Sequence, residues 1–176
     1  MKINSQPIVN SYWVITGRFR AGEYPGSNQD EETRKKLRWL LDQGTNLMLD
    51  LTEVGETGMK PYSHLLYEEA DKIQMPVRYK RLPIPDFTIP SHDMMEEILN
   101  FLDLSLIERK NIYIHCLGGQ GRTGTVVGCY LVRHGMAGDL ALAMIKEFRK
   151  GIPGKHEQSP ETEGQRKMVM EWSKGQ

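Results

Sequence analysis

The sequence predicts a single α/β domain with a mainly parallel central sheet flanked by helices. Short β-rich runs alternate with longer segments in which apolar residues recur at helical spacing, and Gly and Pro mark the boundaries. Such alternation indicates a parallel sheet. The chain has 176 residues, 39% hydrophobic and 26% charged, which is typical of a soluble globular protein. We therefore expect one domain over residues 1–176.

The first half of the chain is expected to supply four strands and two helices. Strands are predicted at 12–16, 18–21, 46–51 and 77–82, and helices at 27–43 and 63–72. Ser27 or Asn28 would cap the first helix and Gly44 would end it. Its inner face would carry Leu37, Leu40 and Leu41. Pro83, Pro85 and Pro90 forbid regular pairing after the strand at 77–82.

The second half is expected to be mostly helical around one more strand. Ser91 would cap a helix to about Arg109, whose apolar positions are Met95, Ile98, Leu99, Leu102 and Leu106. A strand is predicted at 111–115 and helices at 123–134 and 138–149. Pro160, at a first-turn position, would open a last helix toward Trp172.

The strand at 111–115 leads into a loop suited to binding an anion. Residues 111–124 read NIYIHCLGGQGRTG, and Gly118, Gly119 and Gly121 let the backbone approach a ligand closely. Successive amides there can form a nest, and the following helix adds its positive end. Arg122 offers a planar fork for two phosphate oxygens. Cys116 would lie at the base, where the same field favours its thiolate. A nucleophile beneath a bound phosphoryl group indicates a phosphatase.

These residues resemble the signature of the cysteine-dependent protein tyrosine phosphatase superfamily: His115, Cys116, five further residues, Arg122 and Thr123. The order of parts is similar to the dual-specificity branch, including small bacterial and phage-type members and kinase-associated phosphatases. Four more segments carry the resemblance: GRFRAGEYPG (17–26), DLTEVGE (50–56), LPIPDFTIPS (82–91) and SPETEGQR (159–166). It implies a dual-specificity phosphatase-like fold, substrate contacts from Leu117, Gly118, Gly119, Gln120 and Gly121, a phosphocysteine intermediate, and neither metal nor other cofactor.

Asp86 is the candidate general acid. The departing oxygen needs a proton donor opposite the thiolate, and PIPDFTIP resembles the acid loop of the superfamily. Flanking prolines and Phe87 would make that loop stiff and partly apolar, which favours a protonated carboxyl. The alternative is an ordinary turn-forming Asp after Pro. The downstream Cys116 and Arg122 favour the catalytic interpretation.

Other residues are assigned supporting roles. His115 would order the loop and favour the thiolate, or would simply be a core histidine at a strand end. The Thr123 hydroxyl would donate to the cysteine sulfur. Glu161 and Gln165 match a segment that positions the hydrolytic water in relatives, although a Glu-rich helix start would look the same. Glu53 would orient Arg122, or would be an exposed loop acid.

Two further features are weighed against plain structural explanations. Arg78 and Lys80 share one strand face and, with Arg81, form either a basic rim for phosphorylated ligands or a solvated strand edge. Cys129 lies well into the next helix, so we expect buried packing rather than a disulfide with Cys116.

Alternative functions fit less well. GQGRTG (119–124) satisfies a dinucleotide-binding pattern, but a further helix follows where a second strand should. Rhodanese-like sulfur transfer does not call for an Asp on a proline-rich flap. The loop also lacks the lysine of a nucleotide P-loop. A catalytically inactive phosphate-binding module would have lost a reacting group, whereas Cys116, Arg122 and Asp86 are all present.

The expected activity is therefore a protein-tyrosine or dual-specificity phosphomonoesterase. Its partner would be a phosphorylated protein or small phosphorylated substrate, and an inositol-phosphate or metabolite phosphatase is the main alternative. Lys and Arg (23) balance Asp and Glu (23), so attraction to nucleic acid or anionic membranes is not indicated. No leader or membrane-spanning apolar run is seen. Only two cysteines occur, and a thiolate enzyme suits a reducing compartment, so we expect a cytoplasmic monomer.

Overall fold

The computed structural model describes residues 7–58, 60–152 and 158–176. Its sheet has five strands in the order β1-β2-β5-β3-β4; β1 is antiparallel to β2, and the other neighbours are parallel. The strands are β1 Ser11–Ile15, β2 Phe19–Gly22, β3 Leu47–Asp50, β4 Arg78–Arg81 and β5 Ile112–His115. The predicted single α/β domain with a mainly parallel sheet is confirmed.

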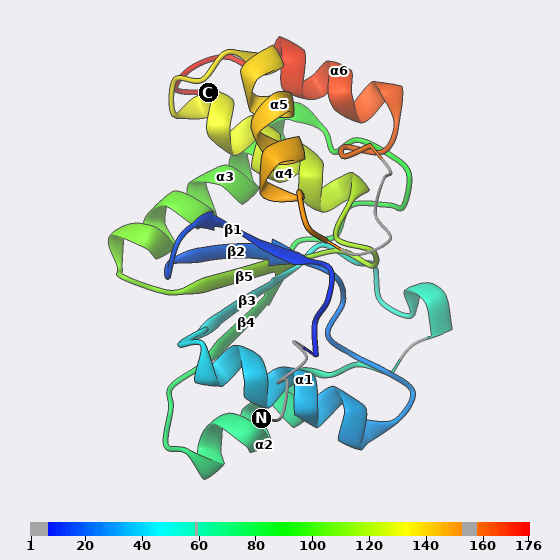
Figure 1. Ribbon diagram of the computed structural model, residues 1–176, viewed down its shortest axis with the longest axis vertical. Helices are drawn as coiled ribbons and strands as arrows, with labels where there is room; N and C mark the ends of the chain where they lie inside the picture. The colour runs from blue at the N-terminus through cyan, green and yellow to red at the C-terminus, as the bar shows by residue number, and fades with distance from the viewer. Residues whose placement is uncertain (1–6, 59, 153–157) are drawn as a thin grey trace.

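Helices cover both faces of this sheet (Figure 1). They are α1 Asp30–Asp42, α2 Ser63–Lys72, α3 His92–Ile107, α4 Gly121–Arg133, α5 Gly138–Phe148 and α6 Glu163–Glu171, with a short 3-10 turn, η1, at Glu56–Gly58. Helices α1 and α2 lie on one face, and α3 to α6 on the other. Within the described ranges, no helix is long and apolar enough to cross a bilayer.

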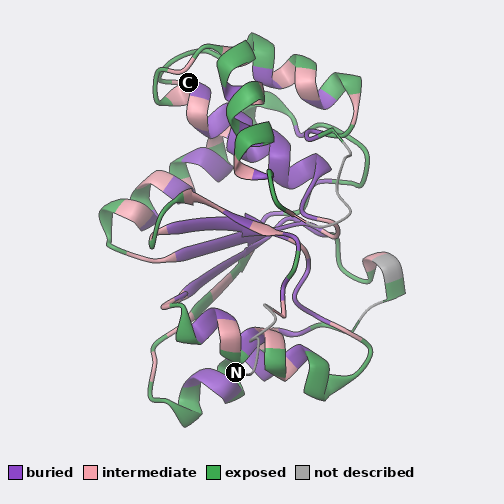
Figure 2. Ribbon diagram, viewed as in Figure 1, coloured by how far each residue is buried: buried purple, intermediate pink, exposed green. Residues whose placement is uncertain are grey.

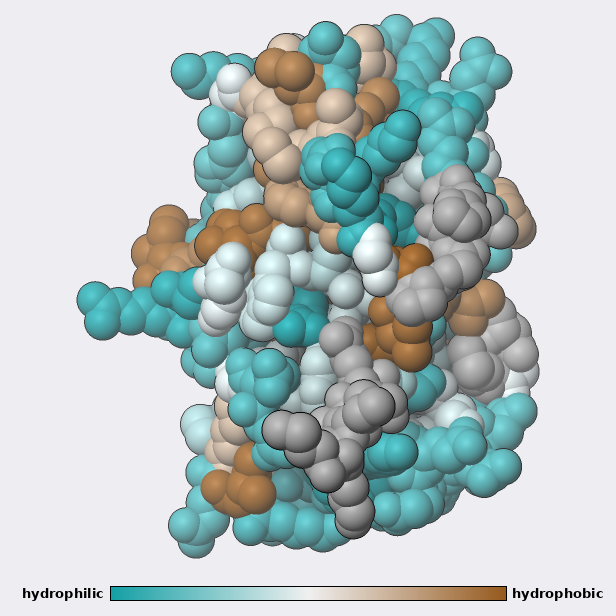
Figure 3. Space-filling view, in the orientation of Figure 1, coloured by the Kyte–Doolittle hydropathy of each residue, from teal (hydrophilic) through white to brown (hydrophobic). Residues whose placement is uncertain are grey.

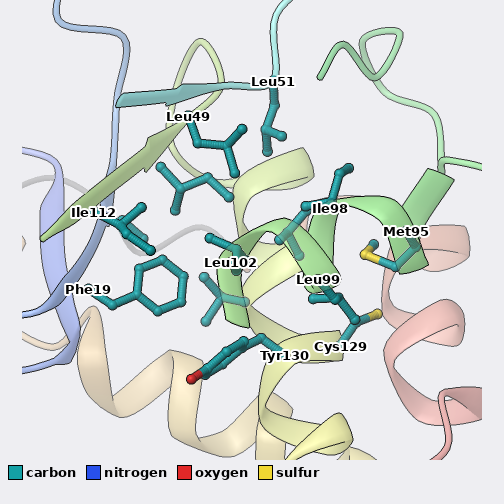
Figure 4. Packing of buried hydrophobic residues seen from close by; sticks show 14 of the residues in the cluster. Phe19, Leu49, Leu51, Met95, Ile98, Leu99, Leu102, Ile112, Cys129 and Tyr130 are labelled. Carbon is teal, nitrogen blue, oxygen red and sulfur yellow. The ribbon is translucent and has the colours of Figure 1, made fainter. Parts of the chain in front are cut away.

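The three inner strands, β2, β3 and β5, are buried on both faces, so the sheet separates two cores (Figure 2). Along β3, Leu47 and Leu49 pack against α3 to α6, whereas Met48 packs against α1 and α2. Tyr113 of β5 joins the same side as Met48. Figure 4 shows the larger core, where Phe19, Leu49 and Ile112 of the sheet meet side chains of α3 and α4. This packing on both faces fixes the position of β5, and therefore also the position of the loop that begins after His115.

The starts of α1 and α6 differ from the prediction. Helix α1 begins at Asp30 with Gln29 as N-cap, because the Ser27 hydroxyl accepts the Gln29 amide at 3.2 Å and donates to Glu32 at 2.7 Å instead of capping. Helix α6 begins at Glu163, so Pro160 lies before the helix rather than in its first turn. Ser91 caps α3 as predicted, accepting the Met94 amide at 3.2 Å.

Candidate active site

The glycine-rich loop emerges from the middle of the sheet edge. Strand β5 lies between β2 and β3 and runs parallel to both, so residues 116–120 sit where three strands end. Helix α4 begins at Gly121, two residues earlier than predicted, which places Arg122 and Thr123 in its first turn. Cys116 is only 3% exposed. The crevice beyond the carboxyl ends of parallel strands is the usual ligand site of an open α/β sheet.

Gly119 shows why the loop requires glycine. Its φ is +69°, a left-handed conformation, and a Cβ there would lie 2.3 Å from the carbonyl carbon of Gly22 and 2.6 Å from the amide nitrogen of Glu23. Backbone atoms cannot yield at such distances. The Tyr24 amide also donates to the Leu117 carbonyl at 2.9 Å. The segment after β2 therefore packs directly on the loop.

Each carbonyl of residues 116–120 accepts a hydrogen bond from a group that lies outside the concave side of the loop. The pairs are Cys116 with His115 Nδ1, Leu117 with the Tyr24 amide, Gly118 with Asn10 Nδ2, Gly119 with Arg149 Nη1, and Gln120 with Ser159 Oγ. By contrast, the amides of residues 117–120 donate to no other residue in the described part of the chain. Unpaired amides on one loop are donors for an anion.

Arg122 is buried among carboxylates and carbonyls. Nη1 donates to Glu56 Oε2 at 2.7 Å and to the Ile84 carbonyl at 3.0 Å, and Nη2 donates to Glu56 Oε1 at 2.5 Å. Nη2 also lies 2.9 Å from Asp86 Oδ1. Burial alone would lower the pKa of Arg122, but the Glu56 hydrogen bonds and the charges of Cys116 and Asp86 raise it. The guanidinium therefore stays charged beside the thiol.

The predicted partnership of Glu53 with Arg122 is wrong, because Glu56 takes that place. The chain turns at Gly55, whose φ is +76°, and η1 brings the Glu56 carboxylate onto the guanidinium. Glu53 is exposed, and its amide donates to Glu56 Oε2 at 3.0 Å. Burial disfavours the charged Glu56 carboxylate, but the Arg122 hydrogen bond lowers its pKa below the ordinary value. The signal for Glu56 was the Gly55 turn, which sequence analysis did not use.

Asp86 lies at the site, but its side chain is more exposed to solvent than expected. Its loop lies over Arg122, yet its side chain is 41% exposed, and Phe87 beside it is 64% exposed. Oδ1 accepts the Phe87 amide at 3.0 Å as well as facing Arg122. The expectation of a partly apolar, desolvated carboxyl is therefore wrong for this arrangement. The loop is held instead by polar contacts with its backbone.

His115 has both ring nitrogens engaged. Nδ1 lies 3.1 Å from the Cys116 carbonyl, which can only accept, so Nδ1 carries the proton. Nε2 then accepts from the Tyr62 hydroxyl at 2.6 Å. Burial lowers the pKa of His115 and outweighs nearby Asp50, which would raise it. Burial also raises the pKa of Tyr62 well above its ordinary value. A neutral histidine thus fixes the direction of the Cys116 carbonyl.

Three other predicted residues lie at the loop with differing contacts. The Thr123 hydroxyl is buried and has no hydrogen-bond partner among the described residues, so its donation to the sulfur stays a prediction. The Gln120 amide group donates to the Gln158 carbonyl at 3.2 Å, and Leu117 packs on the smaller core. Because both side chains are occupied by these contacts, the donors that Leu117 and Gln120 present to an anion are their backbone amides.

Glu161 and Gln165 border the start of α4. A Cβ on Gly121 would lie 3.1 Å from Glu161 Oε2 and from Gln165 Oε1. Gln165 Oε1 accepts the amides of Glu161 and Thr162, both at 3.1 Å, in a capping box at the start of α6. Its Nε2 donates to the Thr88 carbonyl at 3.1 Å. Gln165 thus links α6 to the loop that carries Asp86, a role that sequence analysis missed.

Arg81 is the basic residue of β4 that lies at the site edge. It binds buried Asp50 at 2.9 Å and lines a small depression with Tyr24, Glu56 and Leu117. Arg78 and Lys80 are exposed on the edge strand, and Arg78 begins β4 at its opposite end. This favours the solvated-edge interpretation for that pair. Within the described ranges, no group of three or more His, Cys, Asp or Glu is placed to hold a metal.

A thiol in an anion-binding loop at the carboxyl edge of a parallel sheet, followed by an arginine in the next helix, defines the class of dual-specificity-type cysteine phosphatases. The family model described as "Polymorphic toxin system, DSP-PTPase phosphatase" matches residues 21–136, well over half of the chain. The chain belongs to this phosphatase family. Cys129 is buried in the larger core, as expected.

Similar proteins agree with this class. "Phosphatidylinositol 3,4,5-trisphosphate 3-phosphatase and protein-tyrosine-phosphatase PTEN1" of Arabidopsis thaliana is 36% identical over 95 residues, 51% of this chain and 22% of that protein. An uncharacterized protein of Methanocaldococcus jannaschii is 30% identical over 104 residues, 58% of this chain and 60% of that protein. The chain thus spans less than two thirds of these curated relatives. The structure of Tk-PTP in the active form has a TM-score of 0.67 and 29% identity, covering 93% of this chain and 95% of that one.

Proposed function

We propose that the chain is a phosphomonoesterase of the protein-tyrosine and dual-specificity type that works through a phosphocysteine. Cys116 Sγ attacks phosphorus in line, the bond to the leaving oxygen breaks, and Asp86 gives that oxygen a proton. Water then attacks the phosphocysteine and passes a proton to Asp86, and the sulfur leaves as thiolate. The loop amides and Arg122 hold the non-bridging oxygens in both steps.

The observation that carries this proposal is the 2.9 Å contact between Arg122 Nη2 and Asp86 Oδ1. It joins the candidate acid to the anion clamp although the two residues belong to different segments. Arg122 lies in the first turn of α4, just after the loop that begins with Cys116. The charges of Cys116 and Asp86 both act on its guanidinium, which supports a common site for nucleophile, clamp and acid.

Hydrolysis of p-nitrophenyl phosphate tests the proposal. The chain should turn over this substrate with EDTA present, and Cys116→Ser should lower kcat by at least ~10³-fold. Cys129→Ser is the matched control, because it changes the other buried thiol and should keep turnover. Acid quenching with a ³²P-labelled aryl phosphate should trap label on the wild type. Absence of turnover in the wild type would favour the inactive binding module, and a fully active Cys116→Ser would exclude the nucleophile.

Phosphotyrosine is the proposed substrate class. No lysine occurs between Cys116 and Arg122, and such a loop is less suited to a highly charged inositol ring. The alternative, an inositol phosphate or a small phosphorylated metabolite, is favoured by one specific observation, the lipid activity in the name of the PTEN1 relative. Comparing kcat/KM across phosphotyrosine, phosphoserine and phosphothreonine peptides and inositol phosphates separates these candidates.

A further inference from the structure

A second concave site lies where α5 ends and α6 begins. Its volume is about 660 Å³, within the ordinary range of small-molecule sites. The described residues that line it include four cations and no acid: Lys146, Arg149, Lys150 and Arg166. Leu142 and Ile152 add an apolar wall. On the face seen in Figure 3, hydrophilic surface lies over this end of α5 and α6. The cavity therefore carries a local positive charge, although the chain as a whole has no net charge.

Arg149 is the most telling member of this group. It is 5% exposed, and its Nη1 donates to the Gly119 carbonyl at 3.0 Å and Asn10 Oδ1 at 3.4 Å. Its Nε and Nη2 are buried and find no hydrogen-bond partner among the described residues. Burial raises the pKa of Tyr12, and the positive charge and side-chain donors of nearby Arg149 oppose that rise. Buried donors of a charged group ordinarily have partners.

Helix-dipole effects account for only part of the cluster. Lys146 lies in the last turn of α5, where a cation is favourable, and Lys150 pairs with Glu147 at 2.7 Å. Arg166 lies in the first turns of α6, where the dipole disfavours a cation. Its Nη1 donates to the carbonyls of Pro160 and Glu161 at 3.0 and 2.8 Å. Arg149 is the C-cap of α5, where a cation is also favourable, so the dipole leaves only Arg166 unexplained.

We infer that this cavity binds the phosphate group of a small phosphorylated molecule, at a site separate from Cys116. Lys146 and Arg166 face the anion from the two helices, Arg149 lies beneath it, and the apolar wall contacts the organic part. The site adjoins the glycine-rich loop from outside, because Arg149 binds the Gly119 carbonyl and Ser159 binds the Gln120 carbonyl at 2.7 Å. An anion bound in this cavity therefore acts on the backbone of the glycine-rich loop, whose amides hold the phosphoryl oxygens in the proposed reaction.

Titration of the ¹⁵N-labelled chain with phenylphosphonate, a probe that cannot be hydrolysed, tests this inference at constant ionic strength. Two saturable sets of amide shifts are expected, one at 117–121 and one including Gly151, Ile152 and Ser159, with different midpoints. The double variant Lys146→Gln, Arg166→Gln should weaken the second set by roughly tenfold and spare the first. Lys167→Gln, an exposed cation elsewhere on α6, should change neither. Shifts confined to 117–121, or a second set unchanged in the double variant, would overturn it.

Discussion

Arg122 holds two carboxylates, and they differ in how firmly they are held. Glu56 contacts the guanidinium through both oxygens, at 2.7 and 2.5 Å, and its side chain is 11% exposed. Asp86 contacts it through one oxygen at 2.9 Å and is 41% exposed. A phosphate dianion must compete with them for the same nitrogens. In the proposed reaction a phosphate dianion would displace Asp86 rather than Glu56, because an exposed single contact contributes little in water. The Asp86 carboxyl would then be available to the leaving group.

Replacing Glu56 should weaken the clamp selectively. In Glu56→Gln, Arg122 loses a bidentate charged partner, and kcat/KM for p-nitrophenyl phosphate should fall by roughly 10- to 100-fold, as expected for hydrogen bonds to a charged group. Glu53→Gln is the matched control in the same turn, since Glu53 is exposed. Its kcat/KM should equal that of the wild type. Equal losses in the two variants would contradict the assignment of Glu56 and restore Glu53 as a partner.

The Asp86→Asn variant tests whether Asp86 acts as the general acid or only as a charged partner of Arg122. The amide cannot supply the proton, so kcat should fall by about 10²-fold or more for an alkyl phosphate and far less for p-nitrophenyl phosphate, whose leaving group needs no proton. Since Arg122 also loses a competing carboxylate, KM should not rise. Asp93→Asn, on the exposed first turn of α3, should leave both parameters unchanged. A loss that is the same for both leaving groups would identify another residue as the acid.

At the scale of elements, the loop after β4 is held between two helices. The Ile84 carbonyl accepts from Arg122 of α4, and the Thr88 carbonyl accepts from Gln165 of α6. Gln165 is also the third residue of α6 and closes its capping box with Thr162. The start of α6 and the position of Asp86 are therefore coupled through one side chain. The segment SPETEGQR (159–166) therefore helps to position the loop that carries Asp86.

Two substitutions in that capping box should separate its roles. Thr162→Ala and Gln165→Ala each remove a capping hydrogen bond and should lower the free energy of unfolding by about 1 kcal/mol. Only Gln165→Ala also frees the Thr88 carbonyl, so only it should reduce kcat for poor leaving groups. Urea unfolding and alkyl-phosphate kinetics measure the two effects. Equal kinetic loss in both variants would show that capping alone matters.

The elements were predictable from sequence because their signals are local. Apolar spacing marks the inner face of α3, and strand bounds agree within about one residue. Helix starts were harder to predict, because Ser27 as a cap and Pro160 as a first-turn residue both fit the local sequence, whereas their actual contacts depend on the fold. The same limit applied to the site: Cys116 and Arg122 lie in one continuous motif, whereas Glu56 reaches Arg122 only through the turn at Gly55. A turn at Gly55 can be expected from the sequence, but the distant side chain that it brings to Arg122 cannot.

At the scale of the whole molecule, the buried polar network behind the loop joins three strands. Asp50 of β3 accepts from Tyr79 at 2.7 Å and Arg81 at 2.9 Å, both of β4, and lies 3.9 Å from His115 of β5. Burial opposes the ionisation of Asp50, but the hydrogen bonds from Thr52 and Tyr79 lower its pKa. The glycine-rich loop is thus supported by groups whose charge states matter for folding.

His115 should make global stability depend on mildly acidic pH. Its pKa is lowered in the fold by burial, so below about pH 6.5 the unfolded chain binds a proton that the folded chain does not. Stability should therefore decrease as pH falls from 7.5 to 5.5, with a slope from this group of at most about 1.4 kcal/mol per pH unit. Asp50, whose pKa is lowered from 3.8, contributes a loss only in more acidic solution. In His115→Asn the slope should flatten, whereas exposed His64→Gln should keep the wild-type slope. Urea midpoints across this range measure it, and one common slope for all three proteins would mean that His115 is protonated within the fold.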